Sequence, residues 1–254
     1  MTEHKRVDIT KRKMKIDFII VSKDTRFRME QDAFSKVPAD IEINVVYVSN
    51  NTKSLAEVYN EYLRSERAKS DKCDCLVFMH GDVEFDVGSF SKHLEKVSGK
   101  YDIVGLCGAS TLNVSQSPLN WFTGSVNDPN SRWGCVMHGE LKNQMSWFSQ
   151  HSPDVGDHEV ACIDGLCIIF TRTAIDSKIE FDEAIGKYNC YDTSLCLDAM
   201  LNYNLRIGVI VRKDLVHYSV GKGILNQDFL KDEYSMRRKF NLPIPDNIKQ
   251  IIEK

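Results

Sequence analysis

The sequence predicts an α/β fold with an open, mostly parallel central sheet flanked by helices, in a single domain. Residues 16–22 and 41–48 are rich in β-branched side chains, and small polar residues follow each run, which is typical of central strands. Residues 76–79 form an apolar run, as in a strand that is buried on both faces. Helical segments between these strands favour right-handed parallel crossovers.

The helices are predicted from spacing and end signals. Residues 26–36 are expected to form a helix that ends before Pro38. The best-marked helix begins after Ser54, where the sequence Ser-Leu-Ala-Glu has the form of a capping box and apolar side chains follow at helical spacing. A helix over residues 88–97 and a strand over residues 101–106 continue the alternation.

The pattern changes in the second half of the chain. Residues 108–159 show little periodicity and contain all three tryptophans, so we expect an irregular insertion there. An apolar strand over residues 160–170 follows, interrupted by one Asp-Gly pair. Asp192 is expected to cap a helix, and a strand over residues 206–211 and a helix over residues 228–240 complete the chain.

Composition excludes several classes of protein. With 254 residues, 42% hydrophobic and 27% charged, the chain can bury a sizeable core, and its net charge of −3 does not indicate a nucleic-acid partner. Its eight cysteines include no Cys-x-x-Cys pair, so we expect reduced thiols of a cytoplasmic protein. Residues 1–14 are basic and lack the apolar region of a signal peptide. They are expected to form a solvated arm, with peripheral contact to an anionic membrane as the alternative.

Polar side chains follow the predicted third strand. In an extended backbone His80, Asp82 and Glu84 would share one face. Imidazole and carboxylate groups at the carboxyl end of a buried strand are suited to hold a divalent cation. An acidic surface turn without a ligand is the alternative.

Several motifs in a fixed order carry a resemblance to a known family. Residues 56–60 read Ala-Glu-Val-Tyr-Asn, and residues 77–83 read Val-Phe-Met-His-Gly-Asp-Val. Later motifs are Ile163-Asp164-Gly165, Phe181-Asp182-Glu183, Tyr191-Asp192 and the late His217. This order resembles a GT-A-fold glycosyltransferase of the family-2 type, in the branch that includes the streptomycin-biosynthesis-like glycosyltransferase domains. The resemblance covers residues 15–222 and leaves residues 223–254 as a C-terminal helical extension.

The resemblance implies transfer of a sugar, with inversion, from a nucleoside-diphosphate-sugar donor (UDP-, GDP- or dTDP-sugar) to a glycan or lipid-linked acceptor. A divalent cation, Mn²⁺ or Mg²⁺, would be held by Asp82 together with His80 or Glu84, and by His217. The family's usual Asp-x-Asp motif is replaced here, and the sequence does not choose between His80 and Glu84. Asp192 matches the catalytic base, with an ordinary helix cap as the alternative role.

The resemblance also implies two sets of binding residues. The donor is expected to contact Val21, Ser22, Lys23, Asn50, Asn51, Tyr59, Asn60 and Lys222. The acceptor is expected to contact Asp164, Gly165, Trp121 and Trp147, since sugar rings stack on indole. Where the family often has an acidic residue after the second strand, this chain has asparagines, which leaves the nucleotide base open.

Two other functions remain open at this point. Because the metal motif departs from the family pattern, the chain could be a non-catalytic nucleotide-sugar or glycan-binding module of the same fold. A metal-dependent hydrolase using His80, Asp82, Asp164 and His217 is the third reading. A hydrolase would need a closed ligand set around a water and would leave the first two strand ends without a role.

Overall fold

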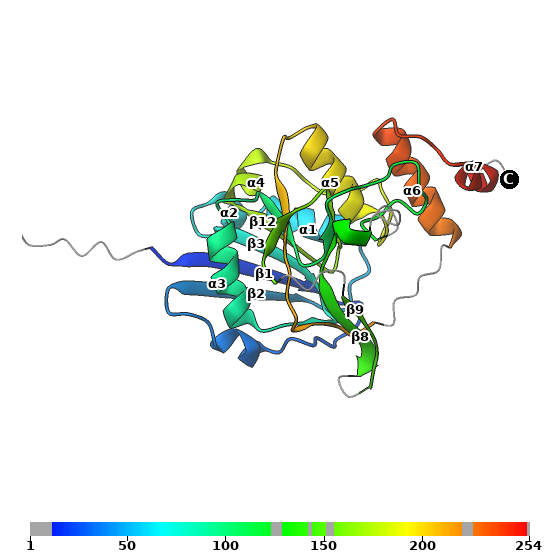
Figure 1. The fold of residues 1–254 in the computed structure, drawn as a ribbon. Coiled ribbons are helices and arrows are strands. Elements are labelled where there is room, and N and C mark those ends of the chain that lie inside the picture. Colours follow the sequence, from blue (N-terminus) through cyan, green and yellow to red (C-terminus); the bar gives the residue numbers. More distant parts are fainter. Residues whose placement is uncertain (1–11, 123–128, 142–143, 151–154, 220–225, 253–254) are drawn as a thin grey trace, which may run out of the picture.

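The computed structural model describes residues 12–122, 129–141, 144–150, 155–219 and 226–252. Most of the predicted basic arm and Lys222 lie outside the described residues. A seven-stranded sheet forms the centre, in the order β10-β13-β5-β12-β3-β1-β2 (Figure 1). Among the described helices, none combines the length and apolar composition needed to span a membrane.

Three neighbouring parallel strands define the functional edge of this sheet. They are β1 (Met14–Val21), β2 (Ile41–Val48) and β3 (Cys75–His80). The last residue of β1, Val21, is in register with Val48 of β2 and with His80 of β3. The carboxyl ends of all three strands therefore meet at one edge, as the sequence predicts.

The other strands of the sheet make it mixed. These are β5 (Ile103–Gly105), β12 (Cys167–Thr171), β13 (Ile207–Ile210) and β10 (Asp157–Glu159). β13 is parallel to β5, whereas β12 is antiparallel to both β3 and β5, and β10 is antiparallel to β13. Five of the seven strands thus run in one direction, which confirms the open, mostly parallel α/β sheet.

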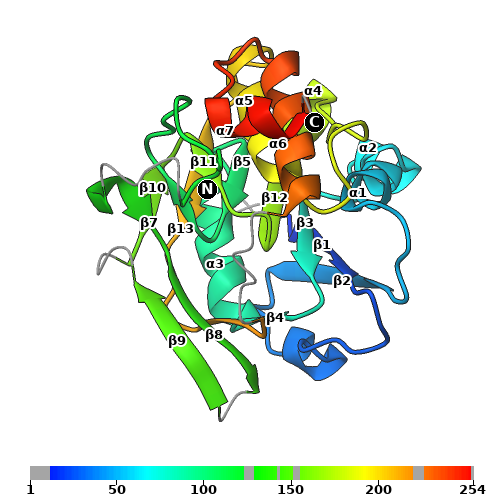
Figure 2. The same cartoon turned by 90° about the vertical axis from the view of Figure 1, so that its right-hand side faces the viewer.

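The helices flank this sheet, and α1 shows its predicted start. The Ser54 hydroxyl accepts a hydrogen bond from the Glu57 amide, and the Glu57 carboxylate accepts one from the Ser54 amide, which completes the capping box. Helices α5, α6 and α7 lie together at one end of the molecule (Figures 1 and 2). The helices are α1 (Leu55–Leu63), α2 (Glu66–Lys69), α3 (Val87–Val97), α4 (Arg172–Ser177), α5 (Tyr191–Leu201), α6 (Gln227–Lys239) and α7 (Asp246–Ile252).

The prediction of a helix over residues 26–36 is wrong. The segment forms only a short 3₁₀ helix, η1 (Gln31–Ser35). Its backbone is used in tertiary contacts instead: the Arg28 amide donates to the Gly81 carbonyl at 2.9 Å, and the Met29 carbonyl accepts from the Tyr47 hydroxyl at 3.0 Å. Groups bonded in this way cannot also form a helical ladder.

The prediction of an irregular insertion is also wrong where residues 108–159 form strands. A hairpin of β8 (Cys135–Leu141) and β9 (Gln144–Gln150) projects from the body of the molecule (Figure 2). β8 pairs with β14 (Leu215–His217), which in turn pairs with β4 (Val83–Glu84) in a second, four-stranded sheet. β8 and β14 are far apart in the sequence, so no local pattern could indicate their pairing.

A third, smaller sheet occupies the same region. It joins β11 (Cys162–Ile163), β6 (Gly108–Ala109) and β7 (Arg132–Trp133). The predicted strand over residues 160–170 is therefore two strands, β11 and β12, separated by the turn at the Asp-Gly pair.

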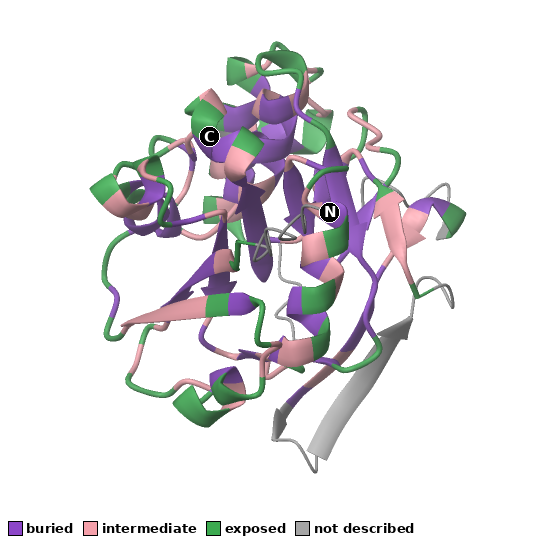
Figure 3. Ribbon diagram, turned by 90° about the vertical axis from the view of Figure 1, so that its left-hand side faces the viewer, coloured by how far each residue is buried: buried purple, intermediate pink, exposed green. Residues whose placement is uncertain are grey.

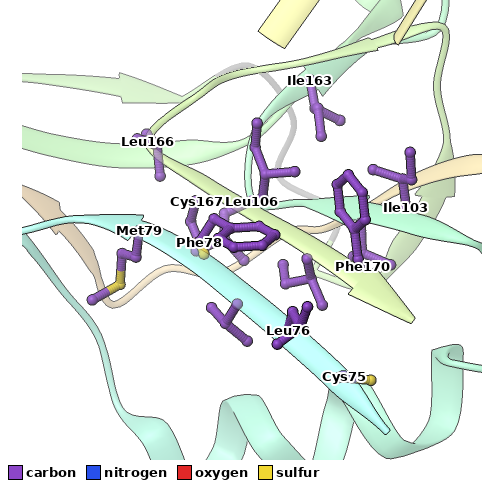
Figure 4. Packing of buried hydrophobic residues seen from close by; sticks show 14 of the residues in the cluster. Cys75, Leu76, Phe78, Met79, Ile103, Leu106, Ile163, Leu166, Cys167 and Phe170 are labelled. Atoms are coloured by element: carbon purple, nitrogen blue, oxygen red, sulfur yellow. The ribbon is translucent and has the colours of Figure 1, made fainter. Parts of the chain in front are cut away.

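The core lies on both faces of the central sheet (Figure 3), with Phe78 of β3 near its centre (Figure 4). Phe78 makes edge-to-face contacts with Phe170 and Phe181, each at 5.6 Å between ring centroids. Tyr59 is fully buried, 4.7 Å from the Phe78 ring. Asn60 is also fully buried and donates to the Phe181 carbonyl. This burial corrects the expectation that Tyr59 and Asn60 contact the donor.

The Tyr59 hydroxyl gives a test of this packing. Within the described residues it is buried without a hydrogen-bond partner. An unpaired buried hydroxyl costs about 1–3 kcal/mol, so Tyr59→Phe is expected to raise the free energy of unfolding by about 1 kcal/mol in urea denaturation. Tyr101→Phe is the matched control, because the buried Tyr101 donates to Asp157 at 3.0 Å and should lose stability. Equal effects of the two substitutions would contradict the interpretation.

Candidate functional site

A cleft of about 460 Å³ opens at the carboxyl ends of β1, β2 and β3. Four of the residues predicted to bind the donor line it: Val21, Ser22, Lys23 and Asn51. Asn50 does not line the cleft; it is exposed and adopts a left-handed backbone conformation with φ of 52°. The strand order of the sheet thus brings the first two strand ends to one cleft.

Besides Lys23, the cleft is lined by one basic and two aromatic side chains that the sequence did not single out, Arg28, Tyr188 and Tyr218. The Arg28 guanidinium lies over the Tyr218 ring at 4.3 Å, and the Lys23 ammonium lies over the Tyr188 ring at 4.0 Å. Such contacts orient a cation on an aromatic face. Arg28 was hidden in the segment misread as a helix, whereas the position of Tyr218 directly after His217 was an available signal.

Three side chains that could hold a metal ion meet at this cleft. His80, Asp82 and His217 each present a ligand atom, and these atoms all lie within 4.8 Å of one another. His80 ends β3, Asp82 follows in a turn, and His217 ends β14. The Asp82 Oδ1 and His217 Nε2 atoms are 3.5 Å apart, and the Asp82 carbonyl accepts from the Tyr218 amide at 2.8 Å. Pairing of β14 with β4 therefore delivers His217 to the end of β3.

Glu84 does not lie in this group. The expectation that it shares a face with His80 and Asp82 requires an extended backbone, but the chain turns at Gly81 and Asp82. Glu84 follows in β4, and its carboxylate accepts a hydrogen bond from the Tyr218 hydroxyl at 2.5 Å. A turn of two residues thus ends the alternation on which the sequence prediction depended.

The charge states of the three side chains follow from their burial and proximity. Burial lowers the pKa of His80. Burial alone would raise the pKa of Asp82, but the hydrogen bond and charge of His217 outweigh it and the net shift is downward. For His217, burial acts to lower the pKa, and the Asp82 carboxylate raises it overall. A carboxylate held ionised beside a neutral His80 is the state that binds a cation.

Asp192 directly follows Tyr191 and is not the helix cap that was predicted. α5 begins at Tyr191, with Cys190 as its cap, so Asp192 lies in the first turn. Its carboxylate accepts from the Gly165 amide at 3.0 Å and from the Thr193 amide at 2.7 Å. Burial, with the neighbouring charge of Asp164, raises the pKa of Asp192 to about 7. A carboxyl group with a pKa in this range is suited to proton transfer at neutral pH.

Asp164 and Trp121 form one hydrogen-bonded unit. The Trp121 indole donates to Asp164 Oδ2 at 2.6 Å, and the Leu166 amide donates to Asp164 Oδ1 at 2.8 Å. Trp121 is 9% exposed, so it orients Asp164 more than it offers a face for a sugar. Trp133 is bound elsewhere, stacked on His158 at 3.6 Å. The backbone of Trp147 lies in β9, and its side chain is outside the described residues.

Gly165 is in close contact with Tyr191 and Asp192, which are distant in the sequence. A Cβ at this position would lie 2.2 Å from the Tyr191 hydroxyl oxygen, so only glycine allows the close approach. The Tyr191 hydroxyl donates to the Gly165 carbonyl at 2.9 Å and lies 2.8 Å from His80 Nε2. Tyr191, which the sequence analysis placed in a motif with Asp192 but gave no role, therefore joins the metal-ligand candidates to the turn that binds Asp192.

Comparison with known families supplies the classification. The model of a family described as "Glycosyltransferase like family" matches residues 19–240. The chain belongs to this family. Membership of this family supports glycosyl transfer as the general class of activity of the chain. Together with the observed central sheet, it confirms the predicted GT-A-like fold class. None of the curated proteins matches the chain at a significant level.

Three solved structures are similar to the chain at low sequence identity. A197 from STIV is 20% identical, with a TM-score of 0.41, over 78% of this chain and 82% of that one. GalNAc-T7 with UDP, GalNAc and Mn2+ is 10% identical, with a TM-score of 0.48, over 89% and 48%. S. aureus TarS is 13% identical, with a TM-score of 0.42, over 94% and 42%. This glycosyltransferase-like chain thus spans less than half the length of the last two proteins.

Proposed function

We propose that the chain transfers a sugar from a nucleoside-diphosphate-sugar donor to an acceptor hydroxyl, assisted by a divalent cation and with inversion at the anomeric carbon. One observation carries the proposal. The cleft at the ends of β1–β3 terminates at His80, Asp82 and His217, and Asp192 is joined to His80 through Tyr191. A donor site, a metal-ligand set and a candidate base are thus adjacent in a member of a glycosyltransferase-like family.

The cleft has the size and charge for a nucleoside diphosphate. Its volume of about 460 Å³ falls within the usual range of small-molecule sites. Lys23 and Arg28 line it and supply positive charge to an anionic donor, whereas Arg26, which also lines it, is paired with Asp24 at 2.8 Å. Ser22 and Asn51 add hydroxyl and amide groups on the same walls. A nucleotide with its diphosphate toward His217 would use all of these groups.

The proposed metal ligands are His80, Asp82 and His217. A cation bound there would neutralise the charge that develops on the leaving diphosphate. Two imidazoles and one carboxylate suit Mn²⁺ better than Mg²⁺, because Mg²⁺ prefers oxygen ligands in octahedral geometry. Three protein ligands are also fewer than either cation normally takes, so the donor's oxygens could complete the set.

Asp192 is the proposed general base. Its carboxylate would accept the proton of the acceptor hydroxyl as that oxygen bonds to the anomeric carbon and the bond to the diphosphate breaks. A single displacement of this kind inverts the anomeric configuration. Asp164, oriented by Trp121, would accept a hydrogen bond from another acceptor hydroxyl. Gly165 would act indirectly, through its amide bond to Asp192.

A thermal-shift panel tests the donor and metal sites together. UDP, GDP, dTDP and their sugars are each tested with and without Mn²⁺. We expect at least one to raise the melting temperature, and the rise to grow with Mn²⁺, because a ligand of the folded state stabilises it by mass action. Asp82→Asn should remove the Mn²⁺-dependent part, whereas the control Glu84→Gln should retain it. The reverse result would assign the cation to Glu84.

The same panel separates the enzyme from a binding module. If no nucleotide shifts the melting temperature, the donor site is contradicted. For a nucleotide sugar that does shift it, we expect release of the nucleoside diphosphate in the presence of Mn²⁺, measured by a coupled assay. Tight binding without release or transfer from any donor would favour the non-catalytic alternative.

A further inference from the structure

The hydroxyl of Tyr191 makes two hydrogen bonds that constrain one another. Tyr191 is 3% exposed, and its hydroxyl donates to the Gly165 carbonyl at 2.9 Å. His80 Nε2 lies 2.8 Å from the same oxygen. A phenol has one proton to donate, and Gly165 is buried, so directing that proton elsewhere would leave its carbonyl without a donor among the described residues. The hydroxyl must then accept from His80, which places the His80 proton on Nε2.

We propose that Tyr191 is a positioning residue that holds neutral His80 in its Nε2–H tautomer and so presents Nδ1 to the divalent cation. The inference rests on the proposed metal-assisted transfer, because it gives the ligand atom of one of the three proposed ligands. The two ring nitrogens of histidine are not equivalent, and the hydrogen bond of one nitrogen decides which of them carries a lone pair.

The packing around Tyr191 keeps this hydroxyl in place. Its ring lies among Tyr59, at 6.3 Å, and Phe181, at 6.1 Å between centroids. On the opposite side, the absence of a side chain at Gly165 gives the hydroxyl its space. A buried tyrosine in such a site has no other position for its hydroxyl without displacing a neighbour. The orientation of the His80 ring is thereby coupled to the core.

The same arrangement couples the metal ligand to the base. Gly165 accepts from Tyr191 through its carbonyl and donates to Asp192 through its amide. Tyr191 and Asp192 are consecutive residues at the start of α5. One helix start and one glycine therefore fix both the tautomer of His80 and the carboxylate of Asp192. This explains physically why a tyrosine stands directly before the proposed base.

Nitrogen-15 NMR of the histidine rings in the metal-free protein tests the inference. His80→Gln assigns the signals, and the ring nitrogen shifts distinguish the two tautomers. We expect wild-type His80 to be in the Nε2–H form and Tyr191→Phe to lose this preference. Tyr59→Phe is the matched control, since it removes a buried tyrosine hydroxyl that, within the described residues, has no partner. It should leave the His80 signals unchanged.

Metal binding provides the second measurement. The affinity for Mn²⁺, measured by calorimetry without donor, should fall by about 10-fold or more in Tyr191→Phe, the usual effect of removing a group that orients a ligating histidine. Tyr59→Phe should keep the wild-type affinity. Zn²⁺, a diamagnetic probe, should shift the Nδ1 signal of wild-type His80.

Three results would overturn the inference. They are an Nδ1–H tautomer in the wild type, the same tautomer and Mn²⁺ affinity in Tyr191→Phe as in Tyr59→Phe, and a Zn²⁺ response at Nε2. The wild-type tautomer needs no variant, so a Tyr191→Phe protein that fails to fold would not prevent the test. Because the tautomer is read without donor or transfer, its failure is distinguishable from failure of the proposed function.

Discussion

Asp192→Asn is expected to lower kcat for sugar transfer by about 10²–10⁴-fold, the usual contribution of a positioned general base. An amide cannot take the acceptor's proton, and its single oxygen can accept from the Gly165 amide or from the Thr193 amide but not from both, so circular dichroism is needed to show that the variant keeps its fold. Steady-state kinetics measures the loss, and calorimetry should show unchanged donor affinity. Asp198→Asn on the same helix is the matched control and should keep kcat, because the Asp198 carboxylate accepts from the Asn202 side chain and has no bond to Gly165.

The pH dependence of this reaction should follow the raised pKa of Asp192, which burial and Asp164 place at about 7. A base acts in its deprotonated form, so kcat should fall about tenfold for each pH unit below this pKa and level off above it. The profile is measured at saturating Mn²⁺, since Asp82 and His217 also titrate. A second activity-limiting carboxyl group would be revealed if Asp192→Asn kept the same midpoint.

The contribution of Asp192 to the free energy of unfolding should fall with rising pH, whereas kcat should rise. A carboxyl group whose pKa is raised by folding favours the folded state below its unfolded pKa and loses that contribution as the pH rises through about 7. Wild-type protein should therefore lose stability relative to Asp192→Asn between pH 6 and pH 8, a range chosen to bracket this pKa. Urea denaturation at both pH values measures the difference.

Arg237→Ala is expected to lower the free energy of unfolding by about 3–5 kcal/mol, because it leaves the buried Glu233 carboxylate without its partner. Both side chains are fully buried in α6, and Arg237 Nε donates to Glu233 Oε1 at 2.8 Å. Arg237 also donates to the carbonyls of Val114 and Pro243, at 2.6 and 2.5 Å. These carbonyls would lose their donor as well.

The control for this substitution is the adjacent residue on the same helix. Arg238 is exposed, and Arg238→Ala should change stability by less than about 0.5 kcal/mol, as for most surface positions. Urea denaturation compares the two variants. If Arg237→Ala were no more destabilising than Arg238→Ala, the buried pair would not contribute as described.

The Glu233–Arg237 pair is also connected to the proposed acceptor site. Glu233 accepts from the Leu119 amide at 3.0 Å and from the Ser117 hydroxyl at 2.9 Å, and the chain then leads to Trp121. Trp121 in turn holds Asp164. Partial loosening of this segment would therefore reach Asp164, a residue of the proposed acceptor site, through the Trp121 indole, although α6 lies outside the cleft.

Elements whose signals are local could be predicted from the sequence. The capping box at Ser54 needs only four consecutive residues, and α1 begins where that motif places it. The apolar run of β3 predicted a central strand, because strands inside a parallel sheet are buried on both faces. The segment 26–36 was misread because its backbone partners, Gly81 and Tyr47, are distant in sequence.

In the candidate site, too, some residues could be predicted from local signals, whereas others depend on contacts between distant parts of the chain. His80, Asp82 and His217 could be chosen by residue type and order, and the structure brings them together. Glu84 is separated from them by a two-residue turn at Gly81 and Asp82. The prediction assumed an extended backbone with alternating side chains and so did not include this turn. Tyr191 could not be found from its sequence position, since its role depends on the proximity of Gly165 and His80 across the fold.

The position of His217 has a consequence for how the site is assembled during folding. His80 belongs to the central sheet, whereas His217 reaches it on β14 of the four-stranded sheet. Contacts between residues so distant in the chain form only after a large loop has been closed. A folding intermediate with an intact central sheet but an undocked β14 would have the cleft walls from β1–β3 without the third candidate ligand. All three candidate ligands would therefore be available to a cation only after the four-stranded sheet has docked on the central sheet.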